Sequence, residues 1–225
     1  PFAKYEIERG CSSVVRFADD TTLELNTAHG LKEFTFDSVF DPESTQGAVF
    51  EDTRNLIQSC LDGYNVCIFA YGQTGSGKTY TIYGDDANPG LTPRAISEVM
   101  RCVHRDSNKC SVKMECYMLE LYRDDLIDLL LPQGAVETPK LEIKKDKKGW
   151  VTVPNATVVS VTSAEEINNV VQAGLKVRKT AGTKMNVESS RSHLIFSIVM
   201  ESTDLQTGAV TKGKLSFVDL AGSER

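Results

Sequence analysis

Residues 66–79 read Val-Cys-Ile-Phe-Ala-Tyr-Gly-Gln-Thr-Gly-Ser-Gly-Lys-Thr, an unbroken apolar run followed directly by a glycine-rich loop. The apolar run has no polar alternation, which is typical of a strand inside a sheet that is covered on both faces. The loop from Gly72 to Thr79 satisfies the pattern G-x4-G-K-[ST], and it lies between this strand and a helical stretch, as the pattern requires. The stretch therefore predicts an α/β fold in which backbone N–H groups wrap around phosphates.

The loop offers side chains suited to a nucleoside triphosphate and its metal ion. Lys78 is expected to bridge the β- and γ-phosphates as a point charge, and the Thr79 hydroxyl is expected to ligate Mg²⁺. A chance match in a glycine-rich loop is the alternative, which the preceding strand disfavours. The predicted nucleotide-binding residues of the loop are Gly72, Gln73, Thr74, Gly75, Ser76, Gly77, Lys78 and Thr79.

A second anchor for the metal, an acidic one, is predicted at Asp219. This residue ends the apolar run Leu215-Ser-Phe-Val, so its carboxylate lies at the carboxyl end of a predicted strand. Beside the phosphate loop of a parallel sheet, such a carboxylate can hold a water molecule bound to Mg²⁺. A lone Asp after a strand is more often a turn residue, and the phosphate loop reverses that preference.

Two polar loops offer groups that could sense a γ-phosphate. Residues 186–193, Asn-Val-Glu-Ser-Ser-Arg-Ser-His, concentrate hydroxyls, an amide and a guanidinium where apolar periodicity is lacking. Short hydroxyls of this kind can reach Mg²⁺ or an attacking water while the backbone folds over the nucleotide. After Asp219, the Gly222 N–H can meet the γ-phosphate, and Glu224 is free to pair with Arg191. An ordinary polar loop is the alternative reading of both segments.

The rest of the chain alternates between strand and helix patterns. Short strands are expected within residues 2–40 and longer ones at 111–120, 194–202 and 213–219. Helical periodicity marks residues 45–61, and Ser163 and Glu166 have the spacing of a capping box at the start of another helix. We therefore predict a P-loop NTPase-type α/β fold, with a mixed, largely parallel central sheet and helices on both faces. No repeat or linker divides the chain, so one domain is expected.

Composition excludes several other classes of protein. The chain has 225 residues, 40% of them hydrophobic and 25% charged, as in one soluble globular domain. Its net charge of -6 argues against a nucleic-acid binder, and no apolar run is long enough to cross a membrane. Six cysteines without a C-x-x-C pair and three scattered histidines suggest no metal cage. These features predict a cytosolic protein with reduced thiols.

Three motifs together resemble those of the kinesin motor domain. They are Y-G-Q-T-G-S-G-K-T-Y-T at 71–81, N-V-E-S-S-R-S-H at 186–193 and V-D-L-A-G-S-E-R at 218–225, in this order. The resemblance extends over nearly the whole chain, through segments such as E-L-Y-R-D-D-L-I-D-L-L at 120–130. The segment N-P-G-L-T-P-R-A at 88–95 is most similar to C-terminal-motor, minus-end-directed kinesins, especially the plant calmodulin-binding branch.

The resemblance implies a microtubule-stimulated ATPase that binds ATP or ADP with Mg²⁺, and it implies roles for single residues. Ser190 matches the serine that coordinates Mg²⁺ together with Thr79, and Asp219 would act through water. Arg191 and Glu224 match a pair that closes a salt bridge over ATP, and Gly222 matches a glycine that senses the γ-phosphate.

Three further residues receive roles from the same resemblance. Ser189 matches the hydroxyl that contacts the γ-phosphate and the lytic water, and Asn186 would steady that loop. Tyr80 takes the position of a ring that packs near the adenine, or it is a core aromatic.

The resemblance also implies partners. Lys144, Lys145, Lys147 and Lys148 match the lobe that touches tubulin, so they could meet the acidic microtubule surface; a solvated hairpin turn is the alternative. A homodimer through a coiled coil and binding of calmodulin are possible through regions outside this chain. The expected location is the microtubule cytoskeleton of the cytoplasm.

Residues 1–225 are expected to be part of a motor domain. By the resemblance, the first strand lies before residue 1, and the relay helix, the main tubulin-binding loops and the neck lie after Arg225. A fragment with these boundaries would be impaired as an ATPase. Two other functions stay open: a kinesin-like module that binds nucleotide or tubulin without turnover, and, far behind it, a signalling GTPase, for which the Asn-Lys-x-Asp run is missing.

Overall fold

The computed structural model describes residues 7–132, 139–147, 149–184 and 190–224, without the side chains of 181–184. Its contacts divide the chain into two compact units, Pro1–Asp52 and Thr53–Arg225. Each unit is described by itself.

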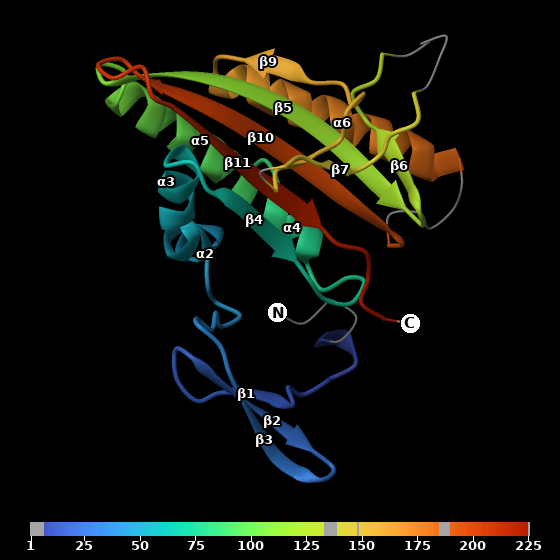
Figure 1. Cartoon of the computed structure of the whole chain (residues 1–225). Helices are drawn as coiled ribbons and strands as arrows, with labels where there is room; N and C mark the ends of the chain where they lie inside the picture. Colours follow the sequence, from blue (N-terminus) through green and yellow to red (C-terminus); the bar gives the residue numbers. More distant parts are fainter. Residues whose placement is uncertain (1–6, 133–138, 148, 185–189, 225) are drawn as a thin grey trace. The chain divides into compact units, whose positions relative to one another are not determined.

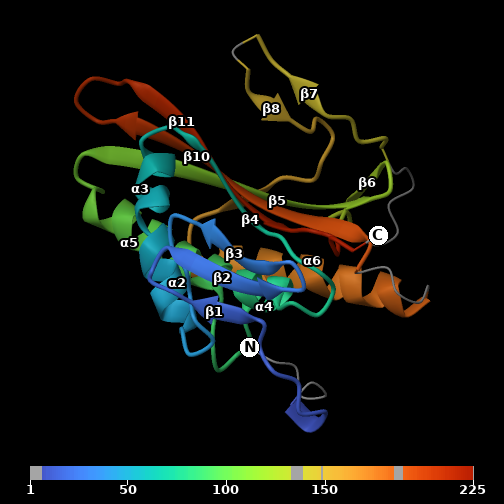
Figure 2. The ribbon, with the colours of Figure 1, turned by 90° about the horizontal axis from the view of Figure 1, so that it is seen from below.

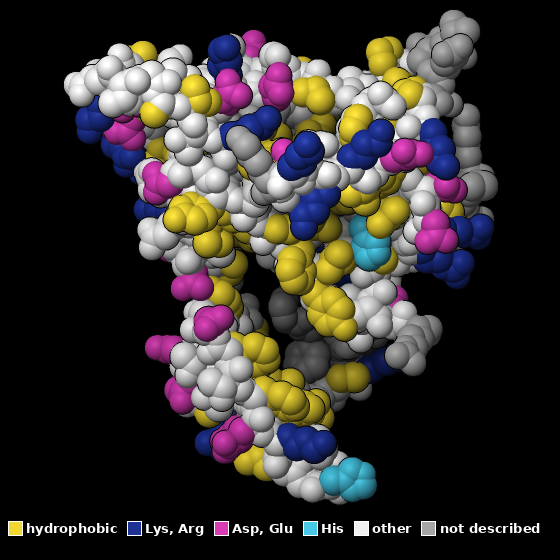
Figure 3. All heavy atoms as spheres, viewed as in Figure 1, with side chains coloured by type: hydrophobic (Ala, Val, Ile, Leu, Met, Phe, Trp, Pro, Cys, Tyr) yellow, Lys and Arg dark blue, Asp and Glu magenta, His cyan; other side chains and the backbone are white. Residues whose placement is uncertain are grey.

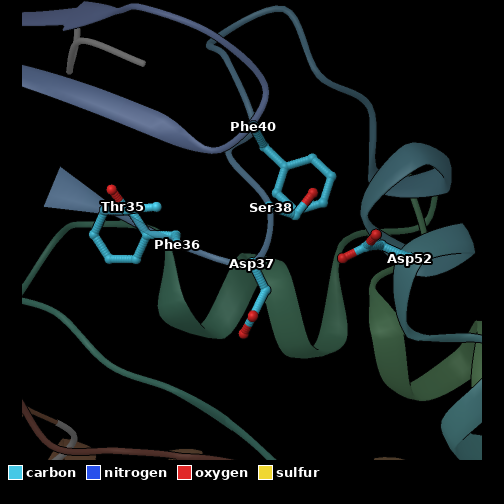
Figure 4. Close-up of a pocket in the computed structure, with 6 residues that line it drawn as sticks. All are labelled: Thr35, Phe36, Asp37, Ser38, Phe40 and Asp52. Atoms are coloured by element: carbon cyan, nitrogen blue, oxygen red, sulfur yellow. The ribbon is translucent and has the colours of Figure 1, made fainter.

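The first unit contains a small antiparallel sheet. Its strands are β1 (Val15–Phe17), β2 (Thr22–Thr27) and β3 (Gly30–Thr35), in that order, and helix α2 (Gln46–Thr53) follows. A hollow of about 570 Å³ is lined by Thr35, Phe36, Asp37, Ser38, Phe40 and Asp52 (Figure 4). Its lining side chains supply carboxylates and hydroxyls but no cation, which does not suit a triphosphate.

The second unit is built on a mixed six-stranded sheet (Figure 1). The order is β4-β11-β10-β5-β6, and β9 pairs with β5. The bounds are Asn65–Ala70 for β4, Val210–Asp219 for β11, Ser192–Asp204 for β10, Cys110–Tyr122 for β5, Asp125–Asp128 for β6 and Val159–Val161 for β9.

The mixed α/β sheet was predicted correctly, but its strands are less parallel than expected. Among the described strands of this sheet, only β4 and β11 pair in parallel, and the other pairings are antiparallel. The reason is local: short turns join β5 to β6 and β10 to β11, and a short turn can only reverse the chain.

Helices α3 (Asn55–Leu61), α4 (Lys78–Tyr83), α5 (Leu91–Arg105) and α6 (Ala164–Lys184) form one layer beside this sheet (Figure 2). Two glycines allow close packing: a Cβ on Gly213 of β11 would collide with the Cys60 backbone of α3, and one on Gly174 of α6 would collide with Met118 of β5. Gly213 and Met118 share one face of the sheet, since both align with inward positions of β10. The helices described in this unit therefore cover one face, whereas helices on both faces were expected.

The core lies between this face and the helices. Phe196 and Phe217 stand directly opposite each other on β10 and β11, and both are fully buried. On the opposite face of β4, Phe69 and its neighbour Tyr71 are 62% and 74% exposed. Hydrophobic side chains are visible at this end of β4 in Figure 3. The alternation explains why the β4 run, predicted to be buried on both faces, is buried on one.

Helix α6 begins as the sequence predicts. The Glu166 N–H donates to Ser163 Oγ at 3.1 Å, and the Glu166 carboxylate accepts from the Thr162 N–H at 2.6 Å. Ile167, Val170 and Val171 form a buried apolar stripe on this helix. In the part of the chain that is described, no helix is both long and apolar enough to cross a membrane.

Candidate nucleotide site

The glycine-rich loop connects the end of β4 to the start of α4, as predicted. Gly75 and Gly77 have φ angles of 80° and 92°, a left-handed conformation that side-chain-bearing residues adopt only with strain. Gly77 lies immediately before Lys78, the first residue of α4. The sequence pattern of the loop therefore corresponds to a backbone that needs its glycines.

Lys78 lies over this loop. Its Nζ donates hydrogen bonds to the carbonyl oxygens of Gly72 at 3.0 Å and Gln73 at 2.9 Å. The ammonium is therefore held where the loop closes on itself, and it is available to a phosphate that approaches the loop backbone.

Thr79 and Asp219 meet at the carboxyl ends of the two parallel strands. Register places Ala70 of β4 opposite Asp219 of β11, and the Thr79 hydroxyl donates to Asp219 Oδ2 at 2.6 Å. Asp219 is 3% exposed, and its Oδ1 has no hydrogen-bond partner among the described residues. A hydroxyl beside a carboxylate with an unused oxygen is the hard-oxygen set that Mg²⁺ prefers, so the residues fit the predicted ion.

Arg178 is a residue of this site that the sequence interpretation missed. Its guanidinium donates to Glu120 Oε1 at 3.0 Å and approaches Asp219 Oδ2 at 3.5 Å, and its exposed fraction is 11%. The Ser192 hydroxyl donates to the same Glu120 oxygen at 2.6 Å and accepts from Arg178 Nη2 at 3.2 Å. Arg178, Glu120 and Ser192 therefore form a buried network that contacts the Asp219 carboxylate through Arg178.

A signal for this network was present in the sequence. Arg178 continues the apolar stripe of α6, four residues after Gly174, and Glu120 follows Met118 with the strand period of two. Charged residues at inward positions of two elements indicate a pair, because a buried charge is rarely left without one.

Tyr83 of α4 adds a buried hydroxyl near Asp219. Burial raises the pKa of Tyr83 well above its usual range, and the negative charge of Asp219 raises it further. The phenol therefore stays neutral at physiological pH.

Backbone hydrogen bonds bring the predicted switch segments to the loop. The Gly222 N–H donates to the Ser190 carbonyl at 2.8 Å, and the Ser223 N–H donates to the Gly72 carbonyl at 3.0 Å. The Gly222 N–H, predicted to sense a γ-phosphate, is thus bonded to the other switch segment. A Cβ on Gly222 would lie 2.5 Å from side-chain oxygens of Thr74 and Glu224, so a larger residue there would displace these side chains.

Glu224 bonds to the glycine-rich loop. Its carboxylate accepts from the Thr74 N–H at 2.9 Å and from the Thr74 hydroxyl, and these bonds lower the pKa of Glu224. No ion pair joins Glu224 to the exposed Arg191 in the part of the chain described, so their pairing stays a prediction.

The remaining site predictions have mixed outcomes. Tyr80 is 47% exposed, so it is not a core aromatic. Asn186, Ser189 and Lys148 lie outside the described residues, and Lys144, Lys145 and Lys147 are exposed. Gln73, Ser76 and the other residues of the glycine-rich loop lie between the end of β4 and the first turn of α4, as predicted. The structure thus joins Lys78, Thr79, Asp219, Gly222 and the Ser190 backbone into one site, and their chemical roles stay predictions.

Comparisons with known proteins agree with this geometry. The family model described as the kinesin motor domain matches residues 1–225. The chain is 62% identical over 194 residues to the kinesin-like protein KIN-14I of Oryza sativa subsp. japonica, covering 86% of this chain and 16% of that protein. Over 194 residues it is 57% identical to the kinesin-like protein KIN-14E of Arabidopsis thaliana, covering 86% of this chain and 15% of that protein.

A solved structure is also similar over the full length of the chain. It is titled as the structure of a fast kinesin, with a TM-score of 0.92 and 34% identity, and the match covers 100% of this chain and 64% of that one. The chain therefore spans about a sixth of these two plant relatives and under two thirds of this motor structure. With its whole length matched by the family model, the chain belongs to the kinesin motor domain family.

Proposed function

We propose that residues 1–225 are part of the motor domain of a microtubule motor that binds and hydrolyses MgATP. The observation that carries the proposal is the 2.6 Å contact between the Thr79 hydroxyl and Asp219 across the parallel pair β4 and β11. This contact supports the proposal because a glycine-rich loop beside an acidic strand end is the arrangement that triphosphate hydrolysis uses.

Hydrolysis in this proposal depends on position and charge and uses no strong base. Lys78 would bind the β- and γ-phosphates, Thr79 and Ser190 would hold Mg²⁺ directly, and Asp219 would hold it through water. When bound, the ion neutralises charge that develops on the γ-phosphate. Ser189 and Asn186 are proposed to orient the lytic water and its loop.

Closure of the switch segments is proposed as the link between nucleotide and movement. Gly222 would exchange the Ser190 carbonyl for the γ-phosphate, and Glu224 would leave Thr74 to pair with Arg191. The bonds that would be exchanged, from the Gly222 N–H to Ser190 and from the Thr74 N–H to Glu224, are single hydrogen bonds, and one such bond contributes only about 0.5–1.5 kcal/mol net.

Replacing Glu224 or Arg191 with Ala is expected to preserve ATP binding and to lower turnover by about 10²-fold or more, because only the closed state gains their pair. Equilibrium binding of a fluorescent ATP analogue and a phosphate-release assay measure the two quantities. Ser223→Ala, which keeps the backbone bond to Gly72, is the control. Undiminished turnover in both variants contradicts the switch.

The partner is proposed to be the microtubule, which also sets the location in the cytoplasmic cytoskeleton. Lys144, Lys145 and Lys147 form an exposed basic tip on a chain whose net charge is -6. Such a tip attracts an acidic surface locally, and its attraction is screened by salt. Homodimerisation and calmodulin binding stay predictions for regions outside this chain.

The decisive experiment measures ATP turnover of the protein with and without microtubules at several salt concentrations. Microtubule stimulation that declines with salt supports the motor. Nucleotide and microtubule binding without turnover would instead support the alternative of a non-hydrolysing kinesin-like module. Retention of Lys78, Thr79, Ser190, Arg191, Gly222 and Glu224 favours turnover.

A further inference from the structure

The one tryptophan of the chain, Trp150, lies under two lysines of a neighbouring strand. The Nζ atoms of Lys212 and Lys214 lie over the indole ring, 5.3 and 5.6 Å from its centroid. Lys214 Nζ also donates to the Val151 carbonyl at 3.0 Å. Burial lowers the pKa of Lys214, and partial loss of hydration strengthens a cation–ring contact.

These lysines rise from the sheet face opposite the helices. On β11 they alternate with Gly213 and Leu215, which are buried against the helical layer. Trp150 and Val151 are therefore held on the other face, where Figure 3 shows Lys and Arg side chains around β7 (Lys144–Lys145) and β11.

The segment that carries Trp150 is a small hairpin with little support of its own. Its strands β7 (Lys144–Lys145) and β8 (Val151–Thr152) have two residues each, and Asp146 closes the turn by bonding the Trp150 N–H at 2.8 Å. No pairing among the described strands connects β7 or β8 to the six-stranded sheet. Because such short hairpins are marginal alone, the contacts of Trp150 and Val151 with β11 support this one.

We propose that Trp150 is a positioning residue that anchors the β7–β8 hairpin to β11 through Lys212 and Lys214. The anchor holds Lys144, Lys145 and Lys147 in a fixed place, from which they meet an acidic protein filament. This inference rests on the proposed function and deepens it, since a pre-positioned basic tip binds without first having to be ordered.

The test compares Trp150→Ala with Trp150→Phe, which keeps a ring, and with Phe34→Ala, which removes an exposed ring from β3 of the first unit. Trypsin reports the anchor, since it cleaves after the tip lysines. Each exposed cation–ring contact is worth about a 2- to 5-fold change in an equilibrium. Cleavage within 144–147 is therefore expected to be about 5-fold faster in Trp150→Ala and close to the parent rate in the other two variants.

Microtubule cosedimentation at several salt concentrations reports the positioning. Trp150→Ala is expected to weaken binding about 3- to 10-fold with unchanged salt dependence, because no charge is removed. A variant that combines Lys144→Gln, Lys145→Gln and Lys147→Gln should flatten the salt dependence, and adding Trp150→Ala to it should have little further effect.

The outcomes separate the anchor, the positioning role and the motor proposal. Equal cleavage rates in Trp150→Ala and the parent overturn the anchor. Faster cleavage with unchanged microtubule affinity overturns the positioning role and leaves the motor proposal standing. A parent protein that does not bind microtubules overturns the motor proposal and the positioning role together, while the cleavage rates still decide whether the anchor exists.

Discussion

Replacing Lys78 with Ala is expected to lower ATP turnover by about 10²- to 10³-fold, the usual effect of removing one preorganised charge from a reacting group. Nucleotide affinity should fall as well, because Lys78 contacts the phosphates in the ground state. The reason lies in the loop: the ammonium is held by the carbonyls of Gly72 and Gln73, where phosphate oxygens would meet the backbone N–H groups. Single-turnover hydrolysis and nucleotide binding measure the two effects separately.

Lys109→Ala is the matched control. Lys109 is 75% exposed, and its ion pair with Asp106 is 4.0 Å long, so its loss should leave both quantities unchanged. A Lys78→Ala protein that hydrolyses ATP at the parent rate would show that the glycine-rich loop is not the phosphate site.

The glycine-rich loop and Asp219 were predictable from the sequence because each depends on local pattern. The glycines need left-handed backbone angles, and Asp219 ends an apolar run, so both signals lie within a few residues. The start of α6 was predictable for the same reason, since the Ser163 hydroxyl accepts from the Glu166 N–H and the Glu166 carboxylate accepts from the Thr162 N–H, all within one helical turn.

The sheet directions and the buried network were less accessible because they depend on pairing between distant segments. The apolar run of β11 looks the same whether its neighbours are parallel or antiparallel, and the hairpin to β10 decides the matter. Arg178 and Glu120 are 58 positions apart, and each alone could be a surface charge. The sequence signal was that both residues occupy inward-facing positions, Arg178 on its helix and Glu120 on its strand. This signal indicates a pair only when the two positions are considered together.

The second large effect is expected at Arg178. Its guanidinium is 11% exposed and lies between the carboxylates of Glu120 and Asp219, which are 8% and 4% exposed. Removing the cation leaves two carboxylates that remain buried without their counter-ion. Loss of one partner of a buried ion pair typically costs about 3–5 kcal/mol. Arg178→Met, which keeps most of the apolar stem, is therefore expected to lower the free energy of unfolding by about that amount.

Denaturant unfolding of the protein measures this change, with Arg105→Met as control. Arg105 also donates to a neighbouring carboxylate, Asp106, but it is 48% exposed, and exposed pairs contribute about 0–1 kcal/mol. A loss at Arg178 no larger than at Arg105 would mean that the network does not stabilise the fold.

A double-mutant cycle separates lost packing from uncompensated charge. If charge causes the instability, adding Glu120→Gln to Arg178→Met removes one stranded carboxylate and should recover part of the loss, although Glu120→Gln alone is destabilising. If packing causes it, the two losses add. Recovery would also predict a functional consequence, because Asp219 belongs to both the network and the predicted metal site. The double variant should then fold better than Arg178→Met yet still bind MgATP more weakly than the parent, since the guanidinium that positions Asp219 is missing.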